Sequence, residues 1–582
     1  RSVGEIYGSN PLGCILGSLL AGFVCIPNLG AQLTLQLAAA LSLTLALVLF
    51  TFGSSQGKRL KLAAPVVLLI AVFMLPAWEP GLMTGGVSFS AAKYLQPGSE
   101  ERLYERPAYY RDGLSATVTV GLQGEDNLYM KINGKVDASS NKRDLHNMYL
   151  TGYLPVLSHP EPKDVALVGL GAGFTAEAVL AVPGIERLDV MELEPEVIEA
   201  EKYFSALNGR VAEDPRYHIH EKDGRTYVMG SPRRYDVIIN QPSNPWLAGI
   251  GNLFTLDYYE HCSDRLKKGG VMCQWFNLYA ASLEETYLVL NTFYSVFPHG
   301  SVWMSSYGDL ILLGSNEPLE LDRKRLRETW EKSEAMRGHF FTIDLFEPDV
   351  IYGQYLFPRE KIVGINPIER KNTDDRPLLE FTAPFNLYKP SEMADIIGTL
   401  FRLAEPHPVA EAVQAESPYT LLHGHINIFR TEGLPKEVLD AQTSESALLH
   451  ARLAMLLEPG ARTEPVRSRL NLALQLDPND SLALTFAAFL ELEQGNFPIA
   501  EVLAERALVD PPPGARNKLV EGLVAARLQQ GKLDQAQPVL EDYLKAHGES
   551  YKAHFLMGQL MFKRKKFEEA KTHLSRAVEL NI

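Results

Sequence analysis

The chain has 582 residues, of which 46% are hydrophobic and 22% are charged, and this composition excludes collagen-like and disordered chains. At roughly 150 residues per domain, the length predicts about three or four domains. The net charge of -15 argues against nucleic acid as a partner, because phosphate binding requires a basic surface. The four cysteines do not stand at metal-ligand spacing, so the sequence predicts no metal site.

Three uncharged apolar runs fill most of the first eighty residues, at 11–29, 31–52 and 62–78. Because about 20 apolar residues span a bilayer, each run predicts a transmembrane helix. A signal peptide would instead have one apolar core followed by a cleavage site. Residues 1–80 are therefore predicted to be transmembrane helices, with the lipid bilayer as a partner.

Basic residues between the second and third runs predict an orientation. Lys58, Arg59 and Lys61 lie in this loop, whereas the turn near residues 27–30 has no charge. Loops rich in lysine and arginine stay in the cytoplasm. The third helix would then carry residues 80–582 to the non-cytoplasmic side of a bacterial-type inner membrane.

The middle of the chain changes to short strands. Residues 81–163 are predicted to be a linker and a small β-structure, because strand-like runs at 115–120 and 128–134 are joined by a glycine-containing connection. From 164 to 315 strands alternate with helices, which predicts an α/β Rossmann-like domain whose parallel sheet is covered on both faces. Its last two strands predict an antiparallel hairpin, typical of S-adenosylmethionine-type transferases. The strands are expected at 165–168, 188–194, 217–224, 235–240, 271–276, 302–307 and 310–315, with a helix at 283–297.

Residues that suit a nucleoside follow three of these strands. Gly169, Gly171 and Gly173 follow the first strand, where glycines let the backbone turn tightly and approach a ligand. Glu192 ends the next strand, where a carboxylate can accept hydrogen bonds from both ribose hydroxyls. Asp223 closes the third strand, where such folds hold the adenine. These five are the predicted cofactor-binding residues.

The segment from about 114 to 315 resembles the spermidine and spermine synthases, which are aminopropyltransferases. The resemblance rests on INGKVDAS (132–139), LVGLGAGFTAEAVL (167–180), VMELEPEVIEAEKYF (190–204) and DPRYHIHEKDGRTYV (214–228). The whole chain resembles the membrane-fused members of that family, in which hydrophobic helices precede the synthase-like domain. The resemblance implies decarboxylated S-adenosylmethionine, or a related nucleoside, as the cofactor.

The chain departs from this family at its acidic positions. In the synthases the fourth strand runs into Asp-x-x-Asp-Pro, whose first Asp takes a proton from the attacking amine and whose second helps to hold the cationic substrate. The matching positions are Gln241 and Asn244, and neutral amides cannot act as a general base. The aspartate of the family's glycine loop is Ala172, and the Tyr-His-Glu-like element reads Asn147-Met-Tyr149. No catalytic residue is therefore assigned.

Other carboxylates could in principle replace the missing ones. Asp137, Asp144 and Asp257 are the candidates, and a solvated or helix-capping role is favoured for each of them. Residues 316–416 are predicted to be an extension and linker. Within it a polar cluster, 372–376, precedes an apolar strand-like run, and we expect this segment to clamp the extension onto the domain.

Residues 417–582 predict tetratricopeptide-like helical repeats. Similar segments at 495–500, 531–536 and 565–570 recur 36 and 34 residues apart and end in Ala500, Ala536 and Ala570. Such arrays present a concave surface to peptides or neighbouring subunits, so protein partners are expected there. We expect the repeats to bury their apolar faces mainly against each other.

Two functions follow. In the first, the chain is a membrane-anchored spermidine-synthase-like protein without polyamine synthase activity, acting through its repeats as a scaffold or accessory subunit of a membrane complex. In the alternative, it is an aminopropyltransferase, or another transferase using an S-adenosylmethionine-type nucleoside, in polyamine metabolism. The missing carboxylates and the predicted non-cytoplasmic location favour the first, and the retained glycine loop favours the second.

Overall fold

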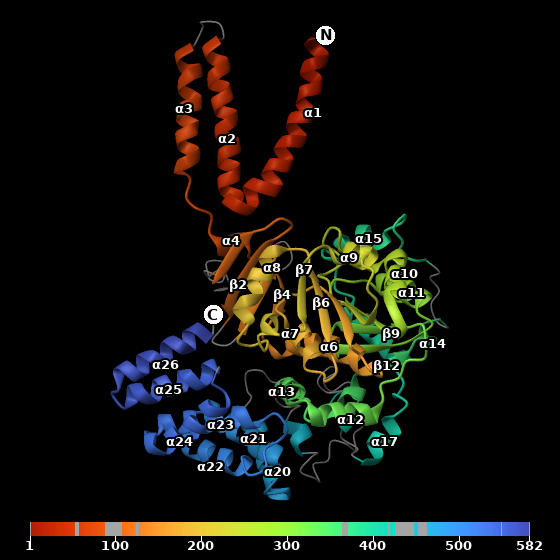
Figure 1. Ribbon diagram of the computed structural model, residues 1–582, viewed down its shortest axis with the longest axis vertical. Helices are drawn as coiled ribbons and strands as arrows, with labels where there is room; N and C mark the ends of the chain where they lie inside the picture. Colours follow the sequence, from red (N-terminus) through yellow and green to blue (C-terminus); the bar gives the residue numbers. More distant parts are fainter. Residues whose placement is uncertain are drawn as a thin grey trace. The chain divides into compact units, whose positions relative to one another are not determined.

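The computed structural model describes residues 2–52, 58–87, 107–123, 127–363, 370–416, 420–422, 424, 447–451, 463–548 and 550–580 (Figure 1). The chain divides into two compact units. The first contains Arg1–Ser140 and Glu192–Glu201, and the second contains Asn141–Met191 and Lys202–Ile582.

The first unit begins with a long apolar helical run. α1 (Ser2–Leu20) continues through a π-helical turn, η1 (Ala21–Cys25), into α2 (Ile26–Phe52). Within this run Asn10–Thr51, 42 residues, is long and apolar enough to cross a membrane. At about 1.5 Å per residue, a straight helix of this length would cross roughly two bilayers. It is not straight, because Gly30 (φ 80°) kinks it between the first two predicted runs (Figure 1).

The helix formed by the third predicted run ends before the apolar sequence does. α3 (Lys58–Met74) lies against α2, and the Gln36 side-chain amide donates to the Val72 carbonyl at 3.0 Å. Its apolar part, Ala63–Met74, is shorter than the roughly 20 residues of a typical span. The chain leaves the helix before residue 78 and forms one more turn, α4 (Pro80–Met83).

A four-stranded antiparallel sheet completes the first unit. Its strands are β1 (Tyr109–Asp112), β2 (Thr117–Gln123), β3 (Asn127–Ile132) and β4 (Lys135–Ser139), paired in chain order. Asn133 and Gly134, both at positive φ, join β3 to β4 in the tight turn that hairpins favour. α8 (Pro195–Glu201) packs against β2. The predicted small β-structure is thus present, with two strands more than the sequence indicated.

The second unit is built around an eight-stranded sheet in the order β12-β10-β11-β9-β8-β5-β6-β7. β5, β6, β8 and β9 pair in parallel, and β10 pairs antiparallel with β11 and with β12. The α/β architecture and the terminal hairpin are therefore confirmed. The strands are β5 (Asp164–Val168), β6 (Arg187–Glu192), β7 (Tyr217–Glu221), β8 (Tyr235–Asn240), β9 (Leu266–Asn277), β10 (His299–Ser306), β11 (Asp309–Ser315) and β12 (Tyr355–Pro358).

Helices cover both faces of this sheet. The Cys273 thiol faces the Thr151 carbonyl of α6 (Lys142–Ser158), whereas the Tyr259 hydroxyl of α10 (Leu256–Arg265) donates to Gln274 at 3.1 Å. Neighbouring residues of a strand point to opposite faces, so α6 and α10 lie on different sides. The other helices between strands are α7 (Phe174–Leu180), α9 (Gly224–Gly230) and α11 (Leu283–Val296).

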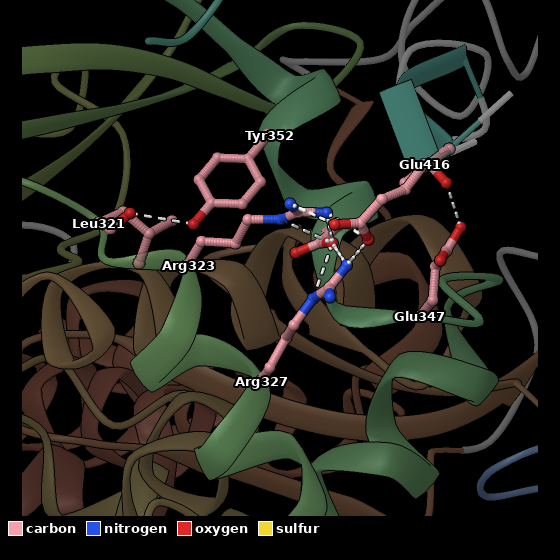
Figure 2. Close-up of polar contacts among 8 residues, drawn as sticks. Leu321, Arg323, Arg327, Glu347, Tyr352 and Glu416 are labelled. Carbon is pink, nitrogen blue, oxygen red and sulfur yellow. Dashed lines mark hydrogen bonds and ion pairs between the residues drawn. The ribbon is translucent and has the colours of Figure 1, made fainter. Parts of the chain in front are cut away.

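The extension after residue 315 is part of this fold. Its strand β12 pairs with β10, so the predicted boundary at 315 excludes a strand that the sheet includes. α12 (Arg323–Lys332) and η7 (Pro348–Gln354) are fastened to α17 (Ala410–Glu416), because Arg323 and Arg327 both bond Asp349 and Glu416 (Figure 2). The extension also contains α13 (Glu334–Thr342), α14 (Glu360–Val363), α15 (Leu378–Asn386) and α16 (Met393–Leu403).

The C-terminal part consists of paired helices, as predicted. Ala500, Ala536 and Ala570 are buried between them. A Cβ at Gly558 would lie 2.6 Å from Leu574, so the last pair packs closely enough to need glycine there. The described helices are α20 (Thr463–Leu476), α21 (Ser481–Glu493), α22 (Phe497–Ala507), α23 (Arg516–Gln529), α24 (Leu533–Ala546), α25 (Tyr551–Lys563) and α26 (Phe567–Leu580).

The repeats do not bury their apolar faces only against each other. Phe341 of α13 and Phe346 lie in one buried cluster with side chains of α21 and α23, among them Leu519. Beside this cluster the Lys518 ammonium lies 5.6 Å from the centre of the Phe341 ring and donates to the Thr342 hydroxyl at 3.2 Å. The expectation of a self-contained array is therefore wrong: α13 is a platform for the repeats.

Candidate functional site

The glycine loop after β5 has the backbone that the sequence predicts. Gly169, Gly171 and Gly173 have φ values of 94°, 53° and 81°. A Cβ at residue 169 would overlap the backbone carbonyl oxygen of Gln241, so glycine is required where these two loops touch. The Gly169 N–H donates to the Met191 carbonyl at 2.9 Å, which holds the loop at the carboxyl edge of the sheet.

Gln241 lies against this loop and already has a side-chain partner. The Thr175 hydroxyl, at the start of α7, donates to Gln241 Oε1 at 2.6 Å. The Gln241 backbone N–H donates to the Val168 carbonyl at 3.0 Å. A neutral amide is therefore fixed at position 241, which the sequence resemblance predicts to match the proton-accepting aspartate of the synthases.

Asn244 is fully buried, and only one of its two side-chain polar atoms forms a hydrogen bond with a described residue. Its amide nitrogen donates to the Tyr279 hydroxyl at 3.1 Å, and its Oδ1 has no hydrogen-bond partner among the described residues. The Trp246 ring meets the Tyr279 ring edge-on at 5.8 Å, and its buried indole N–H has no acceptor within the described part of the chain. Unpaired buried polar groups are costly in a folded protein, so these two atoms are unusual for a buried position.

The other two departures from the family also face protein atoms. Ala172 is fully buried, and its carbonyl accepts a hydrogen bond from the buried Asn208 side chain at 3.0 Å. Asn147 Oδ1 accepts from the Ser305 hydroxyl at 2.6 Å. Neither position presents an anion to a substrate.

The carboxylates of Asp223 and Glu192 each accept a hydrogen bond from a backbone N–H close by in the sequence. The Asp223 carboxylate caps α9 by accepting from the Thr226 N–H at 2.7 Å. Gly224 packs on Val168, the residue before Gly169, because a Cβ there would overlap the Val168 side chain. Asp223 therefore stands beside the glycine loop. Glu192 ends β6, is grouped with the first unit, and accepts from the Glu194 N–H at 2.9 Å.

The three carboxylates considered as replacements have structural partners. Asp137 forms a 2.5 Å ion pair with Lys135 in the first unit. In the second unit Asp144 accepts from the Asn141 amide at 2.9 Å, and Asp257 accepts from the Asp374 N–H at 2.9 Å.

Asp309 is a buried carboxylate that the sequence reasoning missed. It begins β11 directly opposite Asn277 of β9, and the Leu278 N–H beside it bonds the Gly308 carbonyl at 2.7 Å. The Ser306 hydroxyl donates to it. Burial raises the pKa of Asp309 to about 6, against the opposing pull of Arg143. In the sequence, the only indication of this site was an acidic residue at the start of an apolar strand, in the hairpin that follows Tyr279.

A second missed cluster lies behind the glycine loop. Glu177 of α7 lies 2.9 Å from His339 Nε2, and His339 Nδ1 lies 2.6 Å from the Tyr153 hydroxyl. The Tyr149 ring stacks on His339 at 4.4 Å, and its hydroxyl donates to Glu177 at 3.2 Å. Burial and Glu177 keep the pKa of Tyr149 well above its usual value. Because His339 belongs to α13, this cluster joins the helix after the glycine loop to the platform for the repeats.

The polar segment at 372–376 clamps a loop beside the site. Asn372 is fully buried, and its amide nitrogen donates to the Phe254 carbonyl at 3.1 Å. The run after it is helix α15, not the strand that was predicted, and Glu380 in it accepts from the Gly249 N–H at 2.8 Å. Asp374 forms an ion pair with Arg225 of α9. The segment thus holds the loop between β8 and α10, which contains Gln241 and Asn244.

Two parts of the chain match known families. Residues 148–304 match the spermine/spermidine synthase domain, and residues 527–581 match a tetratricopeptide repeat. The chain therefore contains a spermidine-synthase-like domain followed by repeats of this type, as the sequence predicted.

The relatives found carry the name polyamine aminopropyltransferase. The protein from Alkaliphilus oremlandii is 28% identical over 25% of this chain and 52% of its own length. The one from Nitrosomonas europaea is 29% identical over 29% of this chain and 54% of its own length. This chain thus spans about half the length of these relatives. Among solved structures, spermidine synthase from Thermotoga maritima is 22% identical with a TM-score of 0.34, over 38% of this chain and 78% of that one.

Proposed function

We propose that this is a membrane-anchored, synthase-like protein that binds an S-adenosylmethionine-type nucleoside, does not transfer aminopropyl groups to polyamines, and assembles with other proteins through its repeats. The observation that carries the proposal is Gln241, whose amide is bonded to Thr175 where the synthases have their proton-accepting aspartate.

The chemical argument concerns the attacking amine. An alkyl amine is protonated near neutral pH and becomes a nucleophile only after losing that proton. A carboxylate can receive the proton, whereas a carboxamide has no basic site in this range. Asn244 and Ala172 remove two further charges that would attract a polyamine cation. Three neutral positions together argue against polyamine synthesis.

Nucleoside binding is supported by the intact glycine loop. Its three glycines adopt positive φ at the carboxyl end of β5, where ligands of open α/β sheets bind. Asp223 follows β7 and stands next to this loop. By resemblance, Asp223 would hold the adenine and the loop would hold the rest of the nucleoside.

Titration of the full chain in detergent with decarboxylated S-adenosylmethionine tests this binding. Asp223→Ser keeps a helix-capping hydroxyl but removes the carboxylate, so we expect it to weaken binding about tenfold or more, the loss of one charge-assisted hydrogen bond. Asp257→Ser is the matched control and should bind like the original chain. Absence of any binding by the original chain would remove the nucleoside from the proposal.

The membrane anchor is supported by the apolar run Asn10–Thr51 and by the hydrogen bond from Gln36 of α2 to the Val72 carbonyl of α3. A scaffold role is supported by the tetratricopeptide match and by exposed apolar side chains on the repeats, including Phe562 and Phe567. Such repeats carry docking surfaces for extended segments or helices.

Partner capture tests the scaffold role. A chain ending at residue 462 and carrying Phe341→Ser and Phe346→Ser, which remove the apolar surface that the repeats cover, retains Glu416 but loses α20–α26. It should no longer co-purify with the partners of the full chain. Nucleoside binding by the shortened chain serves as the folding control. If the shortened chain binds the nucleoside and keeps every partner, the repeats are not the docking surface.

A second candidate is an aminopropyltransferase, and Asp309 favours it. This buried carboxylate stands at the same edge of the sheet as Asn244 and Tyr279, with a pKa raised to about 6. A carboxyl group with such a pKa suits general acid–base work near neutral pH. If the chain makes spermidine, Asp309→Asn should abolish that activity while Asp257→Asn should not.

A further inference from the structure

A small cavity lies at the opposite edge of the large sheet from the glycine loop. Its volume is about 180 Å³. Its walls are the end of α6, residues 159–162 before β5, residues 182–184 before β6, and one side of α12. These segments precede the strands, whereas the glycine loop follows β5. The cavity is therefore separate from the predicted nucleoside site.

Arg325 of α12 lines this cavity, forms no ion pair with a described carboxylate, and has Asp322 as the carboxylate whose charge acts on it. On the same helix Arg323 and Arg327 converge on Asp349 and Glu416 (Figure 2). Arg325 instead donates through Nη1 to the His159 backbone carbonyl, and no carboxylate of the described residues lies within ion-pair distance of it. Its Nε is buried and bonds no acceptor among the described groups. Burial lowers the pKa of this guanidinium from its usual value.

Two further donors share the cavity side of α12. Thr329 and Lys332 follow Arg325 at helical spacing, four and seven residues on, and both line the cavity. Asp236, a buried carboxylate outside the lining whose Oδ1 lies 3.9 Å from Nε2 of the lining residue His159, is held by Lys267 at 2.9 Å and by the Asp164 N–H at 2.8 Å. It is therefore committed elsewhere. The acidic lining residues Glu161 and Glu328 are exposed, as is Lys332, so water and salt weaken both the repulsion of an anion by the two carboxylates and its attraction by the ammonium.

We propose that this cavity binds the carboxylate or phosphate group of a small molecule, with the Arg325 guanidinium as its principal ligand and Thr329 and Lys332 as further donors. A guanidinium presents paired N–H groups that match both kinds of oxyanion. The volume admits a small oxyanion headgroup and is below the range of sites for drug-sized ligands, about 300 Å³ and above. The inference concerns a second site and does not rest on nucleoside binding.

Thermal unfolding of the full chain in detergent tests the site. Sodium phosphate and sodium acetate are compared with sodium chloride at equal ionic strength. We expect phosphate, acetate or both to raise the Tm by about 2 °C or more, because a ligand of the folded state stabilises it by mass action. A rise with phosphate alone identifies a phosphate site, and a rise with acetate alone identifies a carboxylate site.

Arg325→Gln should lose this rise, and Arg376→Gln, an exposed arginine outside the cavity, should keep it. If Arg325→Gln fails to fold, the double variant Thr329→Val/Lys332→Gln should at least halve the rise. The proposal is overturned if neither salt exceeds the chloride control. It is also overturned if the cavity variants respond like the original chain.

Discussion

Hydrogen bonding at Gln241 decides what this edge of the sheet can do. The Thr175 hydroxyl donates to its side-chain oxygen, and its backbone N–H donates to the Val168 carbonyl. These two hydrogen bonds hold the amide in place. The side chain at this position carries no charge. At the scale of single residues, the chain therefore combines three glycines at positive φ after β5 with a neutral side chain at position 241.

Asp309 allows a prediction about pH. Burial raises its pKa from 3.8 to about 6, so the folded chain holds this proton more tightly than the unfolded chain. Its contribution to stability is therefore complete below about pH 4 and is lost as the pH rises through about 6. The free energy of unfolding of Asp309→Asn, relative to that of the original chain, should therefore increase by roughly 1 kcal/mol between about pH 5 and about pH 8.

The measurement is the Tm difference between Asp309→Asn and the original chain at the two pH values. Asp510→Asn, at an exposed position, is the control and should show a constant difference. A constant difference for Asp309→Asn as well would mean that its carboxyl group does not titrate in the expected range.

The tight turn of the glycine loop was predictable from the sequence, because it depends on local backbone conformation. Three glycines in five residues indicate such a turn. Asp309 and His339 were not predictable in the same way. His339 meets Glu177 from 162 residues away in the chain, and Asp309 is buried by a strand pairing that also depends on distant residues. Only the tertiary structure brings such groups together.

The elements whose sequence signal is strong were predicted well. The fully buried run Tyr235–Asn240 forms β8, and Ser282 with Glu285 forms a capping box that begins α11 near its expected start. The run after Pro377 was expected to be a strand, but it forms α15, whose Phe381 and Phe385 lie one helical turn apart and are exposed. A short apolar run does not distinguish a strand from a helix.

α13 is the element that links the domain to the repeats, and this leads to a prediction about truncation. A chain ending at residue 462 would expose Phe341 and Phe346. Each would lose about 1.5–3 kcal/mol of the stabilisation that its burial provides. We expect a lower Tm and aggregation of the shortened chain, measured by thermal unfolding and light scattering.

Substituting Phe341→Ser and Phe346→Ser in the shortened chain should restore solubility, because the uncovered apolar surface is then removed. The same pair of substitutions in the full chain should lower its Tm. A shortened chain as stable and soluble as the full one would show that α13 does not depend on the repeats.

At the scale of the whole molecule, the order of domains was predictable because each part has its own pattern: apolar runs, strand–helix alternation and a repeat near 34 residues. The boundary at 315 was not, since β12 is four residues long and carries no periodic signal. How the repeats attach was not predictable either, because Phe341 and Phe346 resemble ordinary core residues in the sequence.

Orientation in the membrane is a prediction for the intact chain in cells. With Cys14 and Cys25 replaced by serine, Lys571→Cys in α26 should react with a membrane-impermeant maleimide before lysis. Gln56→Cys, next to the basic residues at 58–61, is the matched control and should react only after lysis. The reverse pattern would place the synthase-like domain in the cytoplasm, where adenosyl cofactors are made.

The central claim is that a synthase fold with Gln241 at the proton-accepting position does not make polyamines. Turnover of decarboxylated S-adenosylmethionine with putrescine or spermidine, measured on the full chain in detergent, tests it most directly. We predict no product above the rate without protein. Sustained formation of spermidine or spermine that Gln241→Ala abolishes would contradict the account.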